Sequence, residues 1–200
     1  MENIKNIITV EIQNIAQDFK QYPDKYLTEN DVRSFLVAKL LKHPEFSEPQ
    51  KTGDCSISIP VHTEVRWYGN SGKLRWRSDI VVIDVASLRT KEGFFSIPSK
   101  GYAFNKPLAI IEVKLRRKNG GSDNDFIKRI KSDFEKLKEI KNEVDGDYLC
   151  ILIALDKKSN IKSKLNDIKK ESTDEEENIK ICYIFPENFS CSSNSVDENS

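Results

Sequence analysis

The stretch Leu108-Ala109-Ile110-Ile111-Glu112-Val113-Lys114-Leu115 decides the fold of this chain. It begins with four apolar residues, a run typical of a buried strand. Because side chains alternate between the two faces of a strand, Glu112 and Lys114 share one face, about 6.6 Å apart along the strand. Two charged groups at the end of a buried strand are costly unless they are paired, metal-bound or exposed in a cleft. The stretch therefore predicts a cleft at the end of a central strand.

The composition is that of a globular chain. The 200 residues, 38% hydrophobic and 32% charged, suit one domain. We expect a single domain over residues 1–185, with an extra N-terminal helix over 3–20, and a polar, disordered tail over 186–200. No window reaches about 18 uninterrupted apolar residues, and the N-terminus lacks the pattern of a signal peptide. These features predict a cytoplasmic protein without a membrane span.

The cysteines carry no metal-binding pattern. Cys55, Cys150, Cys182 and Cys191 lie far apart, with no CxxC pair. Cys150 and Cys182 fall in apolar, strand-like runs, where a buried free thiol is the common state. We therefore expect a reducing compartment and no zinc site.

Charge is unevenly distributed, although the net charge is zero. Residues 62–118 hold 12 Lys and Arg against 5 Asp and Glu, whereas residues 171–200 hold 1 against 8. Such separation favours a polyanionic partner for the basic region. A solvated surface followed by an acidic tail is the alternative interpretation.

Hydrophobic periodicity divides the chain into helices and strands. Thr28 is the expected N-cap of one helix, with Asp31 in capping-box position, and Asp123 or Asp125 is expected to cap a later one. Residues 86–106 suggest a small aromatic hairpin. Helices are predicted over 3–20, 28–43, from 123 or 125 to about 140, and 159–171, and strands over 55–67, 74–85, 108–115, 148–155 and 179–185. This order predicts an α/β fold with a central mixed sheet flanked by helices.

Acidic residues stand on two of the predicted strands, 74–85 and 108–115. Arg-Ser-Asp-Ile-Val at 77–81 follows a hairpin turn, and Ile-Glu-Val-Lys at 111–114 lies on a following strand. The arrangement resembles the PD-(D/E)xK nuclease superfamily, whose motif places an Asp on the second strand and (Asp/Glu)-x-Lys on the third. The resemblance covers about residues 28–155 and implies a restriction-endonuclease-like αβββαβ core. Asp79, Glu112 and Lys114 would be its catalytic residues.

Two further acids extend the resemblance, and one position departs from it. Glu29 matches the acid that the family often carries on the preceding helix, and Glu64 is a fourth candidate catalytic acid. Ser78 stands before Asp79 where the motif has proline, which makes the match less specific.

The chemistry of phosphodiester hydrolysis explains these residue types. A hard cation such as Mg²⁺, for which Mn²⁺ can substitute, stabilises charge on the phosphoryl group and activates water. We expect Asp79, Glu112 and the Val113 carbonyl to bind it, and Lys114 to orient the water or stabilise negative charge. Glu29 or Glu64 would serve a second ion or hold a metal-bound water. Basic residues flanking this end of the sheet would contact phosphates: Arg75, Arg77, Arg116, Arg117 and Lys118.

Each candidate also has a structural interpretation. Asp79, Glu112 and Lys114 can form a plain salt bridge, and Glu29 can complement the dipole of its helix. Glu64 can pair across strands with Arg66 or Arg75. Asp133, inside the helix after the motif, is expected to be solvated or paired with a Lys or Arg one turn away.

The sequence thus leads to one functional hypothesis and its alternatives. The main hypothesis is an Mg²⁺-dependent endodeoxyribonuclease of DNA repair, recombination or restriction-type defence, with DNA preferred to RNA. The alternatives are a catalytically silent nucleic-acid-binding module and an assembly subunit on the same fold. A homodimer or a larger complex is compatible with all three.

Overall fold

A five-stranded mixed sheet with the strand order β3-β4-β5-β6-β7 organises the protein. The computed structural model describes residues 2–68, 74–88, 106–158, 161, 163–165 and 179–186. Antiparallel pairing joins β3 (Val61–Tyr68), β4 (Leu74–Ile83) and β5 (Pro107–Arg116), and parallel pairing joins β5, β6 (Leu149–Asp156) and β7 (Ile179–Ile184). The prediction of an α/β fold with a central mixed sheet is confirmed.

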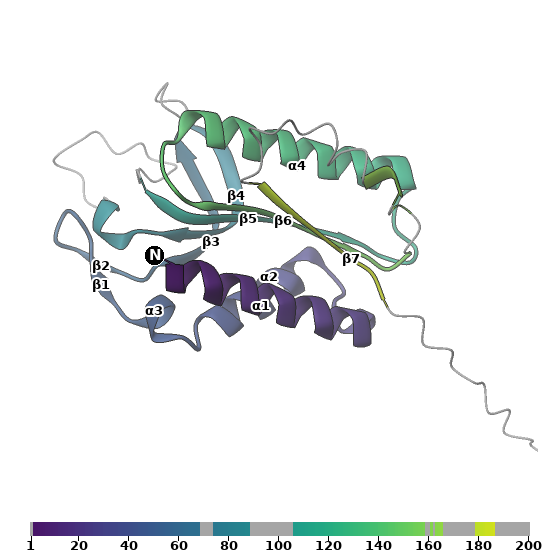
Figure 1. Ribbon diagram of the computed structural model, residues 1–200, viewed down its shortest axis with the longest axis horizontal. Helices are drawn as coiled ribbons and strands as arrows, with labels where there is room; N and C mark the ends of the chain where they lie inside the picture. The colour runs from purple at the N-terminus through teal and green to yellow at the C-terminus, as the bar shows by residue number, and fades with distance from the viewer. Residues whose placement is uncertain are drawn as a thin grey trace, which may run out of the picture.

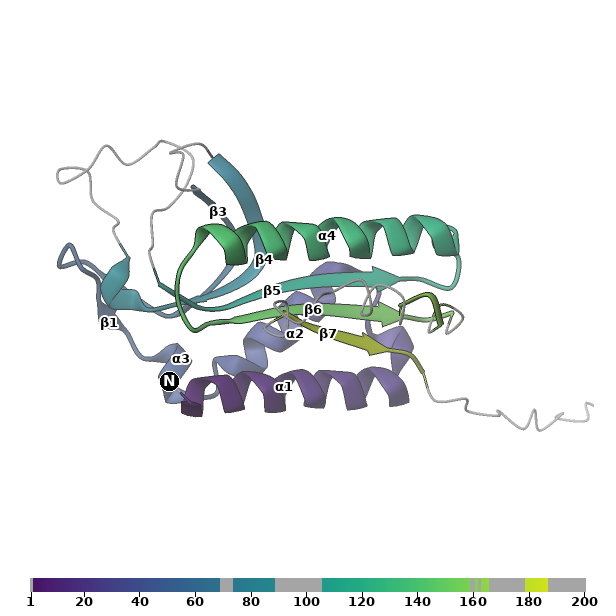
Figure 2. The same cartoon turned by 45° about the horizontal axis from the view of Figure 1, so that its top comes forward.

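Helices cover both faces of this sheet (Figure 1). One face is covered by α1 (Glu2–Gln21) and α2 (Glu29–Leu40), and the other by α4 (Asp123–Glu143). The turned view shows β3 and β4 bending away from the plane of the other strands, towards α4 (Figure 2). The shorter elements are η1 (Pro23–Lys25), α3 (Pro44–Ser47), β1 (Gln50–Lys51), β2 (Ile57–Ser58) and η2 (Val85–Ser87). Glu112 of β5 lies on the α4 side of the sheet, close to Asp133 of α4.

The alternation of side chains along β5 divides the core into two clusters. Ile111 and Val113 pack with apolar residues of α1 and α2. Ile110 packs with α4 residues such as Phe126 and Ile130. Glu112 therefore follows Ile110 onto the face that α4 covers. All eight residues of β6 are buried, as its continuous apolar sequence predicts for a strand covered on both faces.

Local signals in the sequence predicted the N-cap of α2 correctly and that of α4 wrongly. Thr28 caps α2, and its capping box with Asp31 is confirmed. The predicted cap of α4 was wrong: Ser122 is the N-cap, and Asp125 completes the capping box from the third helical position. The hydroxyl of Ser122 accepts from the Asp125 backbone N–H at 3.1 Å, a bond that a residue inside the helix cannot replace.

Other predictions are modified or lie outside the described residues. The strand predicted over 55–67 is divided, because β2 and β3 are separate elements. The hairpin over 86–106, the helix over 159–171 and the tail over 186–200 fall largely outside the described residues. Within the described ranges, no helix combines the length and apolar character needed to cross a membrane.

Candidate functional site

The site forms where β4 stops pairing with β5. The ladder between them runs from Ile83↔Pro107 to Ile80↔Ile111. Beyond Ile111, acidic side chains serve as acceptors for the backbone of β5. The Val113 N–H donates to Asp79 Oδ2 at 2.8 Å, and the Leu115 N–H donates to Glu29 Oε1 at 3.2 Å. The open edge of β5 thus positions two of the acids that the sequence singled out.

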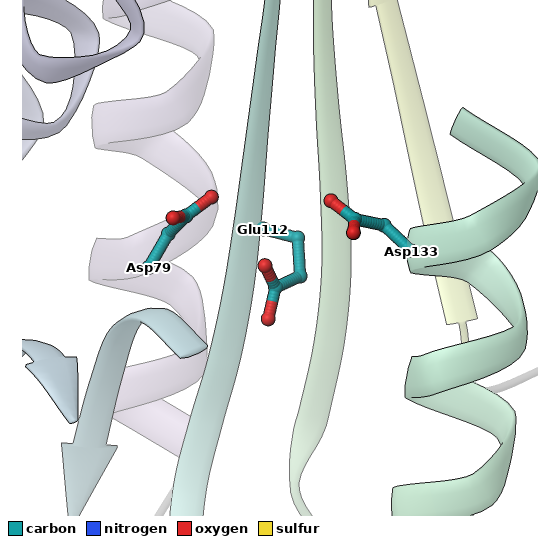
Figure 3. Close-up of side chains that lie close together, drawn as sticks. All are labelled: Asp79, Glu112 and Asp133. Atoms are coloured by element: carbon teal, nitrogen blue, oxygen red, sulfur yellow. The ribbon is translucent and has the colours of Figure 1, made fainter. Parts of the chain in front are cut away.

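Three carboxylates from three elements meet beside this edge. Asp79 of β4, Glu112 of β5 and Asp133 of α4 each offer one oxygen, and these oxygens lie within 4.8 Å of one another. Glu112 lies between the other two (Figure 3). The structure therefore brings Asp79 and Glu112 to the same side of the sheet and adds Asp133. Oxygen atoms at this spacing form a donor set of the kind that hard divalent cations prefer.

Glu112 is the most deeply buried member of this cluster. Its side chain is 1% exposed, and Oε2 pairs with Lys136 Nζ at 2.7 Å. Oε1 is also buried and has no hydrogen-bond partner in the described part of the chain. Burial raises the pKa of Glu112 to about 8; Lys136 opposes this rise, and Asp79 and Asp133 add to it. This carboxylate oxygen, buried beside two other carboxylates, could bind a metal ion.

Lys114 lies beside the same cluster. Its ammonium group pairs with Asp133 and donates to the Val113 carbonyl oxygen at 3.2 Å. Burial by itself lowers the pKa of Lys114, but the carboxylates of Asp133, Asp79 and Glu29 outweigh it and raise the pKa. Lys114 is therefore an ammonium ion at neutral pH. Because the Val113 carbonyl already accepts from Lys114, its part in metal binding stays a prediction.

Glu64 lies outside the three-carboxylate cluster. It has a positive φ of 56° on β3, and its side chain pairs with Arg33 and Arg77 rather than with the predicted Arg66 or Arg75. Arg33 also donates from Nη1 to Asp79 Oδ1 at 3.1 Å. Glu64 thus contacts the cluster indirectly: it pairs with Arg33, and Arg33 donates a hydrogen bond to Asp79.

Glu29 also lies outside the cluster. It sits in the first turn of α2, accepts from the Leu115 backbone and pairs with Arg129 of α4. Asp31, not Glu29, completes the cap of the helix. Glu29 therefore ties α2 to both β5 and α4 at the edge of the site.

Arg116 was wrongly predicted to contact phosphates. Its side chain is 1% exposed and forms a two-pronged ion pair with Asp156, from Nε to Oδ1 at 2.7 Å and from Nη2 to Oδ2 at 2.6 Å. Asp123 accepts from Nη1 at 2.5 Å. The parallel register sets Arg116 directly beside Asp156, so this arginine holds the ends of β5 and β6 together.

The other basic residues that were predicted to contact phosphates are more exposed than Arg116. Arg75 pairs with Glu139 and Glu143 of α4. Arg77 is 57% exposed, and Lys118, at 65%, makes a long contact of 3.4 Å to Asp24. Arg117 is exposed as well.

A cavity lies beside the last residues of β5, next to Glu29. Its volume is about 380 Å³, and its lining includes Glu29, Leu115, Arg117, Gly121 and Arg129. The cavity therefore adjoins the residues that follow Lys114 along the strand. At about 3.3 Å per residue, Leu115 lies about 10 Å along β5 from Glu112.

Asp133 was missed as a site residue, although it pairs with Lys136 one turn away as the sequence suggested. It lies three residues after Ile130 and four before Leu137, both buried in the contact with the sheet. This spacing places Asp133 on the apolar side of the helix, which is unusual for a solvated acid. The position of Asp133 on the apolar side of the predicted helix was the signal that could have identified it as a site residue.

Comparisons with protein-family models, with curated proteins and with solved structures find no match. The chemistry of the residues is therefore the basis for assigning a function. Three carboxylates, one of them with a buried oxygen that has no hydrogen-bond partner among the described residues, and an adjacent ammonium group can bind a hard cation and an anionic substrate together.

Proposed function

We propose that this chain is an Mg²⁺-dependent nuclease that hydrolyses phosphodiester bonds in DNA. The observation that carries the proposal is the meeting of the Asp79, Glu112 and Asp133 carboxylates within 4.8 Å, with Lys114 beside them. Arg33, Lys136 and Lys114 each pair with one of the three acids, yet Glu112 Oε1 stays buried without a hydrogen-bond partner among the described residues.

The donor set suits Mg²⁺, with Mn²⁺ as a substitute. All three side chains offer hard oxygen ligands, and the ion would keep water and substrate oxygens in its remaining positions. When bound, such an ion lowers the pKa of a coordinated water and neutralises charge on the phosphoryl group. Asp79 is already oriented for this task by the Val113 N–H and by Arg33.

Lys114 acts electrostatically in this proposal. Since its pKa is raised by neighbouring carboxylates, it keeps its proton at neutral pH and is a poor general base. Its ammonium group would orient the attacking water or stabilise the negative charge that develops on the phosphoryl oxygens.

The order of elements supports a restriction-endonuclease-like core of the PD-(D/E)xK type. The chain runs α2, β3, β4, β5, α4, β6, with Asp79 on the second of these strands and Glu112 and Lys114 on the third. Exposed basic side chains at Arg77, Arg117 and Lys118 give the substrate backbone a place to bind.

Cleavage assays with a matched lysine control test the proposal. Supercoiled, linear and branched DNA, and RNA, are incubated with Mg²⁺ or EDTA and with wild type, Lys114→Ala or Lys42→Ala. Lys42 is an exposed residue beyond the end of α2 and remote in sequence from the site. We expect DNA cleavage only with Mg²⁺, a loss of about 10²–10³-fold in Lys114→Ala, and no change in Lys42→Ala.

Two outcomes of this assay count against the proposal. DNA binding without cleavage at any Mg²⁺ or Mn²⁺ concentration would favour the silent binding module. Equal cleavage by wild type and Lys114→Ala would remove Lys114 from the chemistry.

A further inference from the structure

A second lysine, Lys136 of α4, reaches into the three-carboxylate cluster. Its Nζ lies 2.7 Å from Glu112 Oε2 and 3.5 Å from Asp133 Oδ1, and it donates to the Arg77 carbonyl oxygen at 3.2 Å. Lys136 therefore occupies a defined position in the cluster and contacts two of the three acids.

We infer that Lys136 takes the place of a second divalent ion, so that the centre binds one metal ion and not two. The inference rests on the proposed function, because it concerns the same centre. It makes Lys136 a positioning residue, which holds Glu112 and fixes the number of ions.

The two oxygens of Glu112 carry the first part of the inference. In a two-metal site the ions lie about 3.5–4 Å apart, and a carboxylate between them can give one oxygen to each. Glu112 lies between Asp79 and Asp133 (Figure 3), but its oxygens are not equivalent. Oε2 is held by an ammonium group, while Oε1 is buried without a hydrogen-bond partner in the described ranges. Only Oε1 is left for an ion.

The second part of the inference depends on the balance of charge in the cluster. Arg33, which contacts Asp79, is offset by its ion pair with Glu64. Three ionised carboxylates, the two ammonium groups of Lys114 and Lys136, and one divalent ion then leave one net positive charge. One phosphodiester group of the substrate neutralises it. A second divalent ion would leave three positive charges in a partly buried cluster, which is strongly unfavourable.

Counting bound Mn²⁺ ions tests this inference. Wild type, Lys136→Met and Lys136→Arg are titrated with Mn²⁺, and free Mn²⁺ is followed by electron paramagnetic resonance. Lys138→Met is the matched control, because Lys138 lies on the same helix and pairs with Glu135 outside the cluster. Thermal melts establish that each variant is folded, and Lys136→Gln replaces Lys136→Met if the latter is not.

We expect one Mn²⁺ per chain in wild type, Lys136→Arg and Lys138→Met. Lys136→Met is expected to bind two, because Glu112 Oε2 and Asp133 Oδ1 lose their cation. Two ions in wild type, or a single ion in folded Lys136→Met and Lys136→Gln, would overturn the inference.

The titration separates this inference from the proposed function. One ion in wild type and two in Lys136→Met, without DNA cleavage by wild type, would contradict the nuclease proposal and leave the role of Lys136 intact. Two ions in a wild-type protein that cleaves DNA would contradict the role of Lys136 alone. Wild type that binds no Mn²⁺ would contradict both.

Discussion

Glu112→Gln should change how the stability of the metal-free protein depends on pH. Glutamine keeps the shape of the side chain but cannot ionise. In the wild type, burial raises the pKa of Glu112 to about 8, from an ordinary value of 4.5 in the unfolded chain. Between these values the folded state binds more protons than the unfolded state, so the free energy of unfolding falls as pH rises from 4.5 to 8.

The size of this effect follows from the two pKa values. Moving the pKa from 4.5 to about 8 corresponds to a cost of about 5 kcal/mol once Glu112 is fully ionised. The contribution is constant below pH 4.5, where both states are protonated, and constant again above pH 8. The stability of Glu112→Gln relative to wild type should therefore rise by up to about 5 kcal/mol between pH 4.5 and pH 8.5.

Urea unfolding in EDTA at several pH values between 4.5 and 8.5 measures this difference. Glu139→Gln is the control, since Glu139 lies on α4 and is half-exposed; its difference from wild type should stay within about 0.5 kcal/mol. A stability difference between Glu112→Gln and wild type that does not change with pH would refute the burial argument for Glu112.

Three further predictions concern other parts of the site. Asp133→Asn should weaken Mn²⁺ binding by tenfold or more, measured by calorimetry, because one of three ligand carboxylates is lost; an unchanged affinity would place the ion elsewhere. Arg116→Met should lower the free energy of unfolding by about 3–5 kcal/mol, because Asp156 is left charged and buried; a urea midpoint equal to that of wild type would contradict this. Arg117→Ala should reduce the salt dependence of DNA binding by about one phosphate contact, and an identical slope would show that Arg117 does not touch the backbone.

Much of the fold could be predicted because its signals are local. The capping box at Thr28 and Asp31 depends on residues three positions apart. The buried strand β6 is visible as one apolar run. Asp79 and Glu112 could each be placed on a strand because both lie within strongly apolar runs, and the alternation in β5 fixes the face of Glu112.

The remainder of the site depends on contacts between distant parts of the chain. Asp133 and Lys136 enter the cluster only because α4 packs over β5 with this side of the helix inward. Arg116 looked like a basic loop residue, but the register of β5 against β6 places it beside Asp156. Neither the packing of α4 nor the register of β6 is encoded in a short pattern.

The most direct test of the central claim is anomalous diffraction from crystals soaked in Mn²⁺. If Asp79, Glu112 and Asp133 form a metal centre, a single strong peak should lie between their carboxylates, about 2.1 Å from Glu112 Oε1. The absence of a peak there at saturating Mn²⁺, with the three carboxylates ordered, would contradict the assignment of this cluster as a metal centre.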